Sequence, residues 1–188
     1  MMRRVTTFCA AVACLGCGGA ATGAQAAGHG GRPLPPYGRH DAVLFDDGIE
    51  PTAIGYPMAE GTPPLRDNLL RERTEVGDAV VRARVTTVTS KQEDRGRSWQ
   101  LGFHALERLA GSGPLDPDFT LQVDATDPAA GIVRAYENRL IGTTFVVFVR
   151  EFARPAADAE GDWHYHIAAD QKDELDAVRA AVLLEQVR

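Results

Sequence analysis

The sequence contains very little cysteine. Its three cysteines, Cys9, Cys14 and Cys17, all lie within the first 17 residues. Nothing after them can therefore form a disulfide or act as a thiol nucleophile. The domain that follows has to be held together by packing and hydrogen bonds, without covalent cross-links.

Long apolar runs are also missing. The uncharged stretch at residues 5–15 is much shorter than the roughly 20 residues that a transmembrane helix needs, and no later apolar stretch approaches that length. The sequence therefore predicts no membrane-spanning segment in the mature protein.

Positive charge is scarce. The chain holds 20 lysines and arginines against 26 aspartates and glutamates, a formal net charge of −6, and only Lys91 and Lys172 are lysines. Nucleic-acid-binding proteins usually show the opposite balance. We therefore expect no nucleic acid among the partners.

Serine is rare, and the motifs of common enzyme classes are missing. The only serines are Ser90, Ser98 and Ser112, and Ser112 stands in Gly-Ser-Gly-Pro instead of a Gly-x-Ser-x-Gly elbow. The chain has neither a phosphate-binding loop nor a dinucleotide fingerprint. We therefore assign no catalytic residue and expect a protein that is not an enzyme.

The first 26 residues have the pattern of an export signal. Arg3 and Arg4 precede the uncharged stretch at 5–15, and small residues follow it. One cleavage site lies after Ala26, in the small-x-small pattern Ala24-Gln25-Ala26. Cleavage there predicts a soluble periplasmic or secreted protein.

A second cleavage site lies before Cys17. The sequence Leu15-Gly16-Cys17 ends the apolar stretch and resembles the lipidation site of bacterial lipoproteins, and the N-terminal half is similar to uncharacterised bacterial envelope lipoproteins. The resemblance implies a lipid on Cys17, an outer-membrane anchor and a flexible tether behind it. Either cut removes two arginines and no acid, so the formal net charge of −6 becomes −8.

Residues 27–77 are expected to be a linker with short docked segments. The stretch at 28–39 is rich in glycine and proline and has no periodic apolar positions. The stretch at 42–54 is more apolar and suits a short docked helix or turn, and 65–75 suits one or two helical turns.

Residues 78–188 have the pattern of a compact domain with five strands. A helix is expected after Asp127, between the third and fourth strands, and another after Asp170. The fourth strand is apolar on both faces, so we expect it to be the most buried. The expected strands are 79–89, 99–103, 119–123, 143–149 and 161–168.

This order of elements resembles the OB-fold, and the C-terminal helix makes it similar to the netrin/TIMP-like branch of that architecture. The resemblance covers residues 78–188 and implies a mainly β domain, a five-stranded barrel. Those domains generally carry disulfides, which this chain lacks, so TIMP-type inhibition is not carried over. The alternative is an α+β sheet covered by helices.

His164 and His166 form the sharpest local pattern. A His-x-His step on a strand places both imidazoles on one face about 7 Å apart, a geometry from which metal sites are built. His104, in the second strand, is a candidate third ligand for a divalent metal, and otherwise no cofactor is expected. The alternative is that both histidines face solvent on an edge strand.

Two further patterns suggest ions as ligands. Arg82 and Arg84 project from one strand face and suit a carboxylate, a phosphate or an anionic glycan, although ordinary surface pairing explains them as well. The acids at 116, 118, 124 and 127 could supply oxygen ligands to calcium, but they lack EF-hand spacing.

Together these observations predict an exported cell-envelope protein that is a lipoprotein. We expect a non-enzymatic binding or structural module for a protein or glycan partner, attached to the membrane by its lipid alone. The alternative is a metal-binding protein or metal-dependent enzyme that uses His164 and His166.

Overall fold

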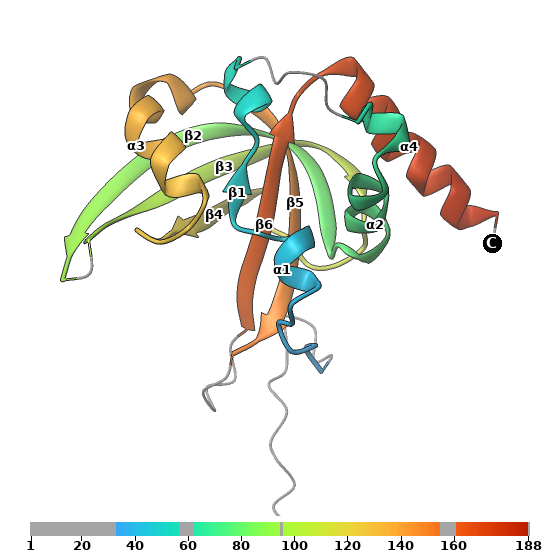
Figure 1. Cartoon of the computed structure of the whole chain (residues 1–188), viewed down its shortest axis with the longest axis horizontal. Coiled ribbons are helices and arrows are strands. Elements are labelled where there is room, and N and C mark those ends of the chain that lie inside the picture. The colour runs from blue at the N-terminus through green and yellow to red at the C-terminus, as the bar shows by residue number, and fades with distance from the viewer. Residues whose placement is uncertain (1–32, 57–61, 95, 155–160, 188) are drawn as a thin grey trace, which may run out of the picture.

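The computed structural model describes residues 33–56, 62–94, 96–154 and 161–187. Cys17 and both cleavage sites lie outside these residues. A six-stranded mixed sheet, in the order β1-β6-β5-β2-β3-β4, forms the centre of the molecule (Figure 1). The strands are β1 (Gly48–Ile49), β2 (Ala79–Glu93), β3 (Gly96–Ala110), β4 (Asp118–Val123), β5 (Thr144–Ala153) and β6 (Gly161–Ala169).

Helices cover both faces of the sheet. Those on one face are α1 (Asp41–Leu44), α2 (Asn68–Val76) and α4 (Lys172–Gln186), and α3 (Ala129–Leu140) packs on the other. Two short 3-10 helices, η1 (Pro51–Ile54) and η2 (Pro64–Arg66), lie in the N-terminal segment. Among the described residues, none of the helices is long and apolar enough to cross a membrane.

The central strand β5 contributes side chains to the hydrophobic cores on both faces of the sheet. Its neighbours are β2 and β6, both antiparallel to it. Phe145, Val147 and Val149 enter the core under α3, and Val146 and Phe148 enter the core under α2 and α4. The sequence prediction of a strand buried on both faces is thus confirmed, and α3 and α4 supply the cover it requires.

The mainly β prediction is confirmed, but the five-stranded barrel is not. The sheet has six strands and is open, an α+β arrangement dominated by the sheet. The added strand, β1, is parallel to β6 and has only two residues, too few to show a period in the sequence. The five expected strands all overlap strands of the structure.

Two described stretches of the N-terminal segment, residues 33–56 and 62–76, belong to the packed structure. Leu44 and Phe45 are fully enclosed beside Leu70 in the core under α2 and α4. Together with β1, they extend the hydrophobic core into the range described above as a linker with docked segments.

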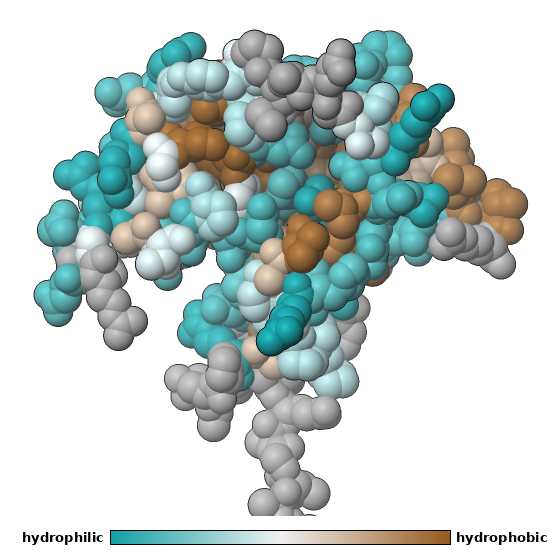
Figure 2. Space-filling model, viewed as in Figure 1, coloured by the Kyte–Doolittle hydropathy of each residue, from teal (hydrophilic) through white to brown (hydrophobic). Residues whose placement is uncertain are grey.

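The face of the molecule shown in Figure 2 is mostly polar, with several apolar areas. Figure 2 shows an apolar area over the C-terminal end of α4, where Leu183, Leu184 and Val187 are exposed. The preceding part of the same helix is packed on the domain through Ala177, Val178 and Ala181.

Candidate functional site

The two histidines singled out by the sequence lie on the same face of β6 and do not face solvent. The side chain of His164 is 19% exposed and that of His166 is 8% exposed. The segment that contains β1 pairs with this edge of β6, with Gly48 opposite His166. The alternative of two solvent-facing histidines on an edge strand is therefore wrong, because the N-terminal segment covers them.

His166 lies between two carboxylates. Its Nδ1 is 2.8 Å from Oδ1 of Asp46, and its Nε2 is 3.0 Å from Oε1 of Glu50. Two carboxylate partners require both ring nitrogens to donate, which only the charged imidazolium can do. Burial alone would lower the pKa of His166, but the hydrogen bonds to Asp46 and Glu50 outweigh it and raise the pKa.

The same contacts act on the two acids. Burial alone would raise the pKa values of Asp46 and Glu50, and the hydrogen bonds and charge of His166 reverse that effect and lower both. Thr52 also donates to Oε2 of Glu50 at 3.1 Å. The three side chains are thus ionised together near neutral pH.

His164 forms a second histidine–carboxylate pair beside the first. Its Nδ1 is 2.6 Å from Oδ2 of Asp47, and the ring of Tyr37 stacks on the imidazole with 3.7 Å between centroids. The other oxygen of Asp47 accepts a hydrogen bond from the backbone N–H of Tyr165. These contacts hold Asp47 in a left-handed conformation, φ 52°, which aspartate tolerates better than most residues.

We call Asp46, Asp47, Glu50, His164 and His166 the histidine–carboxylate cluster. Arg73 lies beside it, 5% exposed, donating from Nε to the backbone oxygen of Leu44 and lying over the ring of Phe148. The cluster joins the segment around β1 to β6 through charge-assisted hydrogen bonds. The cluster therefore holds the segment at residues 46–50 against strand β6.

The structure does not bring His104 to the other two histidines. His104 lies on β3, and β5 and β2 separate β3 from β6 in the sheet. Its Nδ1 is 2.7 Å from Asp118, its neighbour across the β3–β4 pairing. Over the part of the chain that the structure describes, no group of three or more His, Cys, Asp or Glu residues has an arrangement that could hold a metal ion.

The two arginines proposed as an anion site differ in their surroundings: Arg82 is paired with a carboxylate, and Arg84 is exposed. Arg82 donates from Nε and Nη2 to the two oxygens of Asp170, both at 2.8 Å, so its guanidinium is already occupied. Arg84 is exposed on the same strand. Asp170, the residue after which the C-terminal helix is expected, pairs with Arg82, and Gln171 takes the N-cap position of α4.

The acids proposed for calcium are divided between the two ends of β4. Asp118 begins the strand, whereas Asp124 follows its end and donates its backbone N–H to Oδ2 of Asp127 at 2.6 Å. Burial, with repulsion from Asp47 and Asp124, raises the pKa of Asp127 to about 6. The four acids therefore do not form one ligand set.

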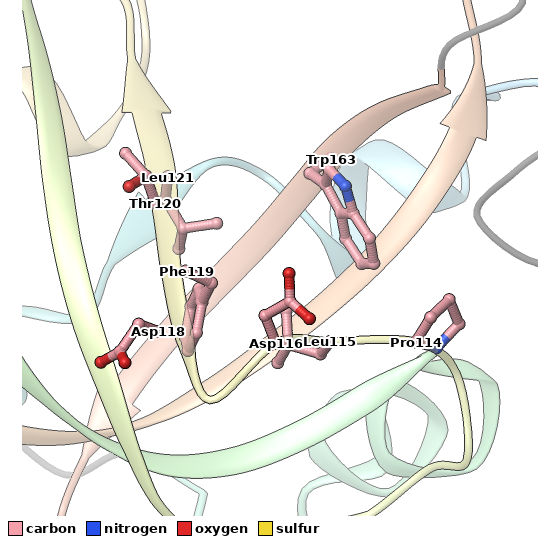
Figure 3. A pocket seen from close by; sticks show the side chains of 8 residues that line it. All are labelled: Pro114, Leu115, Asp116, Asp118, Phe119, Thr120, Leu121 and Trp163. Carbon is pink, nitrogen blue, oxygen red and sulfur yellow. The ribbon is translucent and has the colours of Figure 1, made fainter.

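A pocket that the sequence did not reveal lies on the α3 side of the sheet. Its volume is about 310 Å³, and it is formed by the strand β4, the loop before it and β6. Figure 3 shows Trp163 of β6 facing Phe119 of β4 across the hollow, with the carboxylate of Asp116 between them. The lining residues of this aromatic pocket are Pro114, Leu115, Asp116, Asp118, Phe119, Thr120, Leu121 and Trp163.

The curl of the sheet creates the aromatic pocket. β4 and β6 are separated by three strands in the sheet, yet residues of both line one hollow. Phe119 is held by stacking on Phe103, with 5.2 Å between centroids, and Asp118 is held by His104. The alternation of the sequence placed Phe119 and Trp163 on the inward faces of their strands, but it could not show that both stay partly open.

Comparisons with known proteins add no relative. No protein-family model matches the chain, and neither the curated proteins nor the solved structures include a match.

Proposed function

We propose that the protein is an exported, lipid-anchored envelope protein that acts as a non-enzymatic binding module, with a glycan bound in the aromatic pocket. The export pattern at residues 1–26 and the Leu15-Gly16-Cys17 sequence support the location. The observation that carries the binding role is the placement of Trp163 opposite Phe119 with Asp116 between them.

This combination of side chains suits a sugar. A sugar ring has an apolar face of C–H groups and an edge of hydroxyls. The indole of Trp163 offers a flat apolar surface, and the carboxylates of Asp116 and Asp118 accept hydrogen bonds from hydroxyl groups. A pocket of about 310 Å³ is at the lower end of the range for small-ligand sites, and one or two sugar rings fit such a volume.

The charge of the pocket narrows the class of glycan. Two carboxylates line it, and no basic side chain does among the described residues. Like charges brought together in a partly enclosed site repel, so anionic glycans are disfavoured. Neutral sugars and amino sugars are the expected ligands.

The test is calorimetric titration of the mature protein with a neutral sugar oligomer, a soluble chitin tetrasaccharide, and with an amino-sugar oligomer, a soluble chitosan tetrasaccharide. We expect binding that Trp163→Ala weakens at least about tenfold, because removing an aromatic anchor loses most of the stacking surface. Leu183→Ala, an exposed change on α4, is the control and should leave the affinity unchanged.

Two outcomes would contradict the proposal. One is that neither glycan binds; the other is that the Trp163→Ala variant binds as tightly as the parent. Capture of a protein partner through Trp163 in place of either glycan would assign the pocket to protein recognition.

A further inference from the structure

A second pocket, beside the β1–β6 edge of the sheet, is strongly acidic. It has a volume of about 460 Å³ and lies between η1, the segment around η2, the end of β6 and the start of α4. Its charged lining residues are Glu50, Asp67, Asp173 and Glu174, and no described basic residue lines it. We call it the acidic pocket.

Glu174 is the unusual member of this group. Its residue is 9% exposed, and its carboxylate makes no hydrogen bond or ion pair with any described residue; Oε2 is fully enclosed. Buried carboxylates are normally hydrogen-bonded, because an unpaired buried charge is costly. An enclosed acid without a partner in a pocket wall therefore points to a ligand that supplies the missing donor.

The other acids of the pocket either accept hydrogen bonds within the protein or are exposed to solvent. Glu50 accepts from His166 and Thr52. Asp67 caps α2 by accepting the backbone N–H of Leu69 at 2.8 Å, and Asp173 is exposed. Only Glu174 combines burial with an unused carboxylate.

The positively charged side chains near the pocket interact with groups other than Glu174. His166 is held between Asp46 and Glu50, and Arg73 donates to the backbone of Leu44 while lying over Phe148. Lys172, on the first turn of α4, pairs with Asp176. The pocket therefore keeps an excess of negative charge.

We propose that the acidic pocket binds a positively charged aliphatic amine, whose ammonium group donates to Glu174. An ammonium carries three donors, enough to reach Glu174 and a second acid of the wall. Three prolines in the lining offer apolar surface for an aliphatic stem. A metal ion fits less well, because the described acids do not form a metal-holding group.

The titration of Glu174 agrees with this geometry. Burial, followed by repulsion from Glu50 and Asp67, raises its pKa to about 7 against the opposing charges of His166 and Arg73. A bound ammonium would favour the ionised carboxylate and lower the pKa again. Binding at pH 7 should therefore release a fraction of a proton.

The ammonium can come from a free polyamine or from a lysine side chain of a partner. Calorimetric titrations of the mature protein with putrescine and with acetyl-lysine-amide separate these sources, and N-acetylputrescine tests whether the second charge is needed. Binding by putrescine alone assigns a free polyamine, and binding by the lysine compound assigns a peptide partner. Repeating each titration in two buffers of different ionisation enthalpy measures the proton release.

Glu174→Gln is the decisive variant, because it keeps the shape and removes the charge. We expect it to weaken amine binding at least about tenfold and to abolish the proton release. Glu185→Gln, the same change at an exposed position of α4, should behave like the parent. Glu174→Gln also removes an unpaired buried charge, so the variant is expected to fold.

Three results would overturn the proposal: no amine binding by the parent, equal amine affinity in Glu174→Gln, or Glu174-dependent binding of Ca²⁺ with no amine binding. The proposal is independent of the glycan site. Glycan titration of the Glu174→Gln variant should match the parent, so failure at either pocket is detected separately.

Discussion

Arg82 and Asp170 are joined by two parallel hydrogen bonds of 2.8 Å, which tie the first part of β2 to the residues just before α4. A flat guanidinium can make this two-pronged contact with a carboxylate, whereas an ammonium cannot. We expect Arg82→Lys to lower the free energy of unfolding by about 1 kcal/mol.

Denaturant titration measures this change. Arg179→Lys is the matched control, because Arg179 makes only single, exposed contacts, with Glu107 at 3.5 Å and with Asp176 at 3.9 Å, among the described residues. That variant should lose less than about 0.5 kcal/mol. Equal losses of unfolding free energy in the two variants would show that the two-pronged contact of Arg82 with Asp170 adds no stability beyond that of an ordinary surface pair.

The second prediction concerns His166. Its replacement by glutamine removes the charge that compensates Asp46 and Glu50, which then stay partly buried without a cation between them. We expect the free energy of unfolding at pH 6 to fall by about 3 kcal/mol. His104→Gln, which affects an exposed pair, should change it far less.

The pKa directions determine the pH range of this effect. The raised pKa of His166 means that its contribution is complete below its ordinary value of 6.5 and is lost as the pH rises through the raised pKa. The lowered pKa values of Asp46 and Glu50 mean that their contribution is complete above about pH 4.5 and is lost as the pH falls through the lowered values. The difference between parent and His166→Gln should therefore be largest between about pH 4.5 and 6.5; a difference that does not change with pH would contradict the ionised cluster.

Two glycines with open space around them should respond in opposite directions. A Cβ on Gly131, in α3, or on Gly142, just after it, would meet nothing within 4 Å. Gly131→Ala should stabilise the protein by about 0.5 to 1 kcal/mol through helix propensity. Gly142 has φ +85°, so Gly142→Ala should destabilise it by about 1 kcal/mol. Thermal unfolding of both variants checks the pair, and a shift in the same direction would refute it.

Metal content tests the alternative reading of His164 and His166. Three of their four ring nitrogens are within hydrogen-bond distance of carboxylates, and His104 is paired with Asp118. We expect elemental analysis of protein purified without a histidine tag to find Zn, Cu and Ni well below one equivalent. One equivalent that disappears in a His164→Ala, His166→Ala double variant would establish a metal site.

Lipid attachment is tested at Cys17. If this cysteine carries the anchor, Cys17→Ala should move the protein from the membrane fraction to the soluble fraction of cells. Cys14→Ala, a neighbouring cysteine change, is the control and should leave the fractionation as it is. Retention of the Cys17→Ala variant in the membrane fraction would reject the anchor.

Sequence reasoning located most of the strands because their burial leaves a repeating pattern. The two-sided apolar character of β5 and the one-sided alternation of β4 follow directly from their neighbours. β1 has no such pattern: two residues cannot show a period, and its pairing with β6 depends on residues more than 100 positions away. The same limit left the order of the strands, and hence the open sheet, undetermined.

The sites were harder to predict for the same reason. The sequence placed His164 and His166 on one face, but their partners Asp47 and Asp46 lie 117 and 120 positions earlier. Any of the many acids could have filled those roles. The aromatic pocket likewise depends on the curvature of the sheet, which brings β4 near β6. The unpaired carboxylate of Glu174 could not be predicted either, because the sequence does not show that no hydrogen-bond donor lies within reach of it.

The route by which the chain enters the sheet has a mechanical consequence. The oxygen of Pro35 accepts the backbone N–H of Ala153, and further along Asp47 and Glu50 donate to Tyr165 and Ile167 of β6. A pull applied ahead of residue 33 would load the Pro35–Ala153 bond first, and then the pairing of β1 with β6. Tension on the N-terminal side would thus be borne first by the Pro35–Ala153 bond and then jointly by the β1–β6 pairing and the histidine–carboxylate cluster, whose Asp46, Asp47 and Glu50 flank β1.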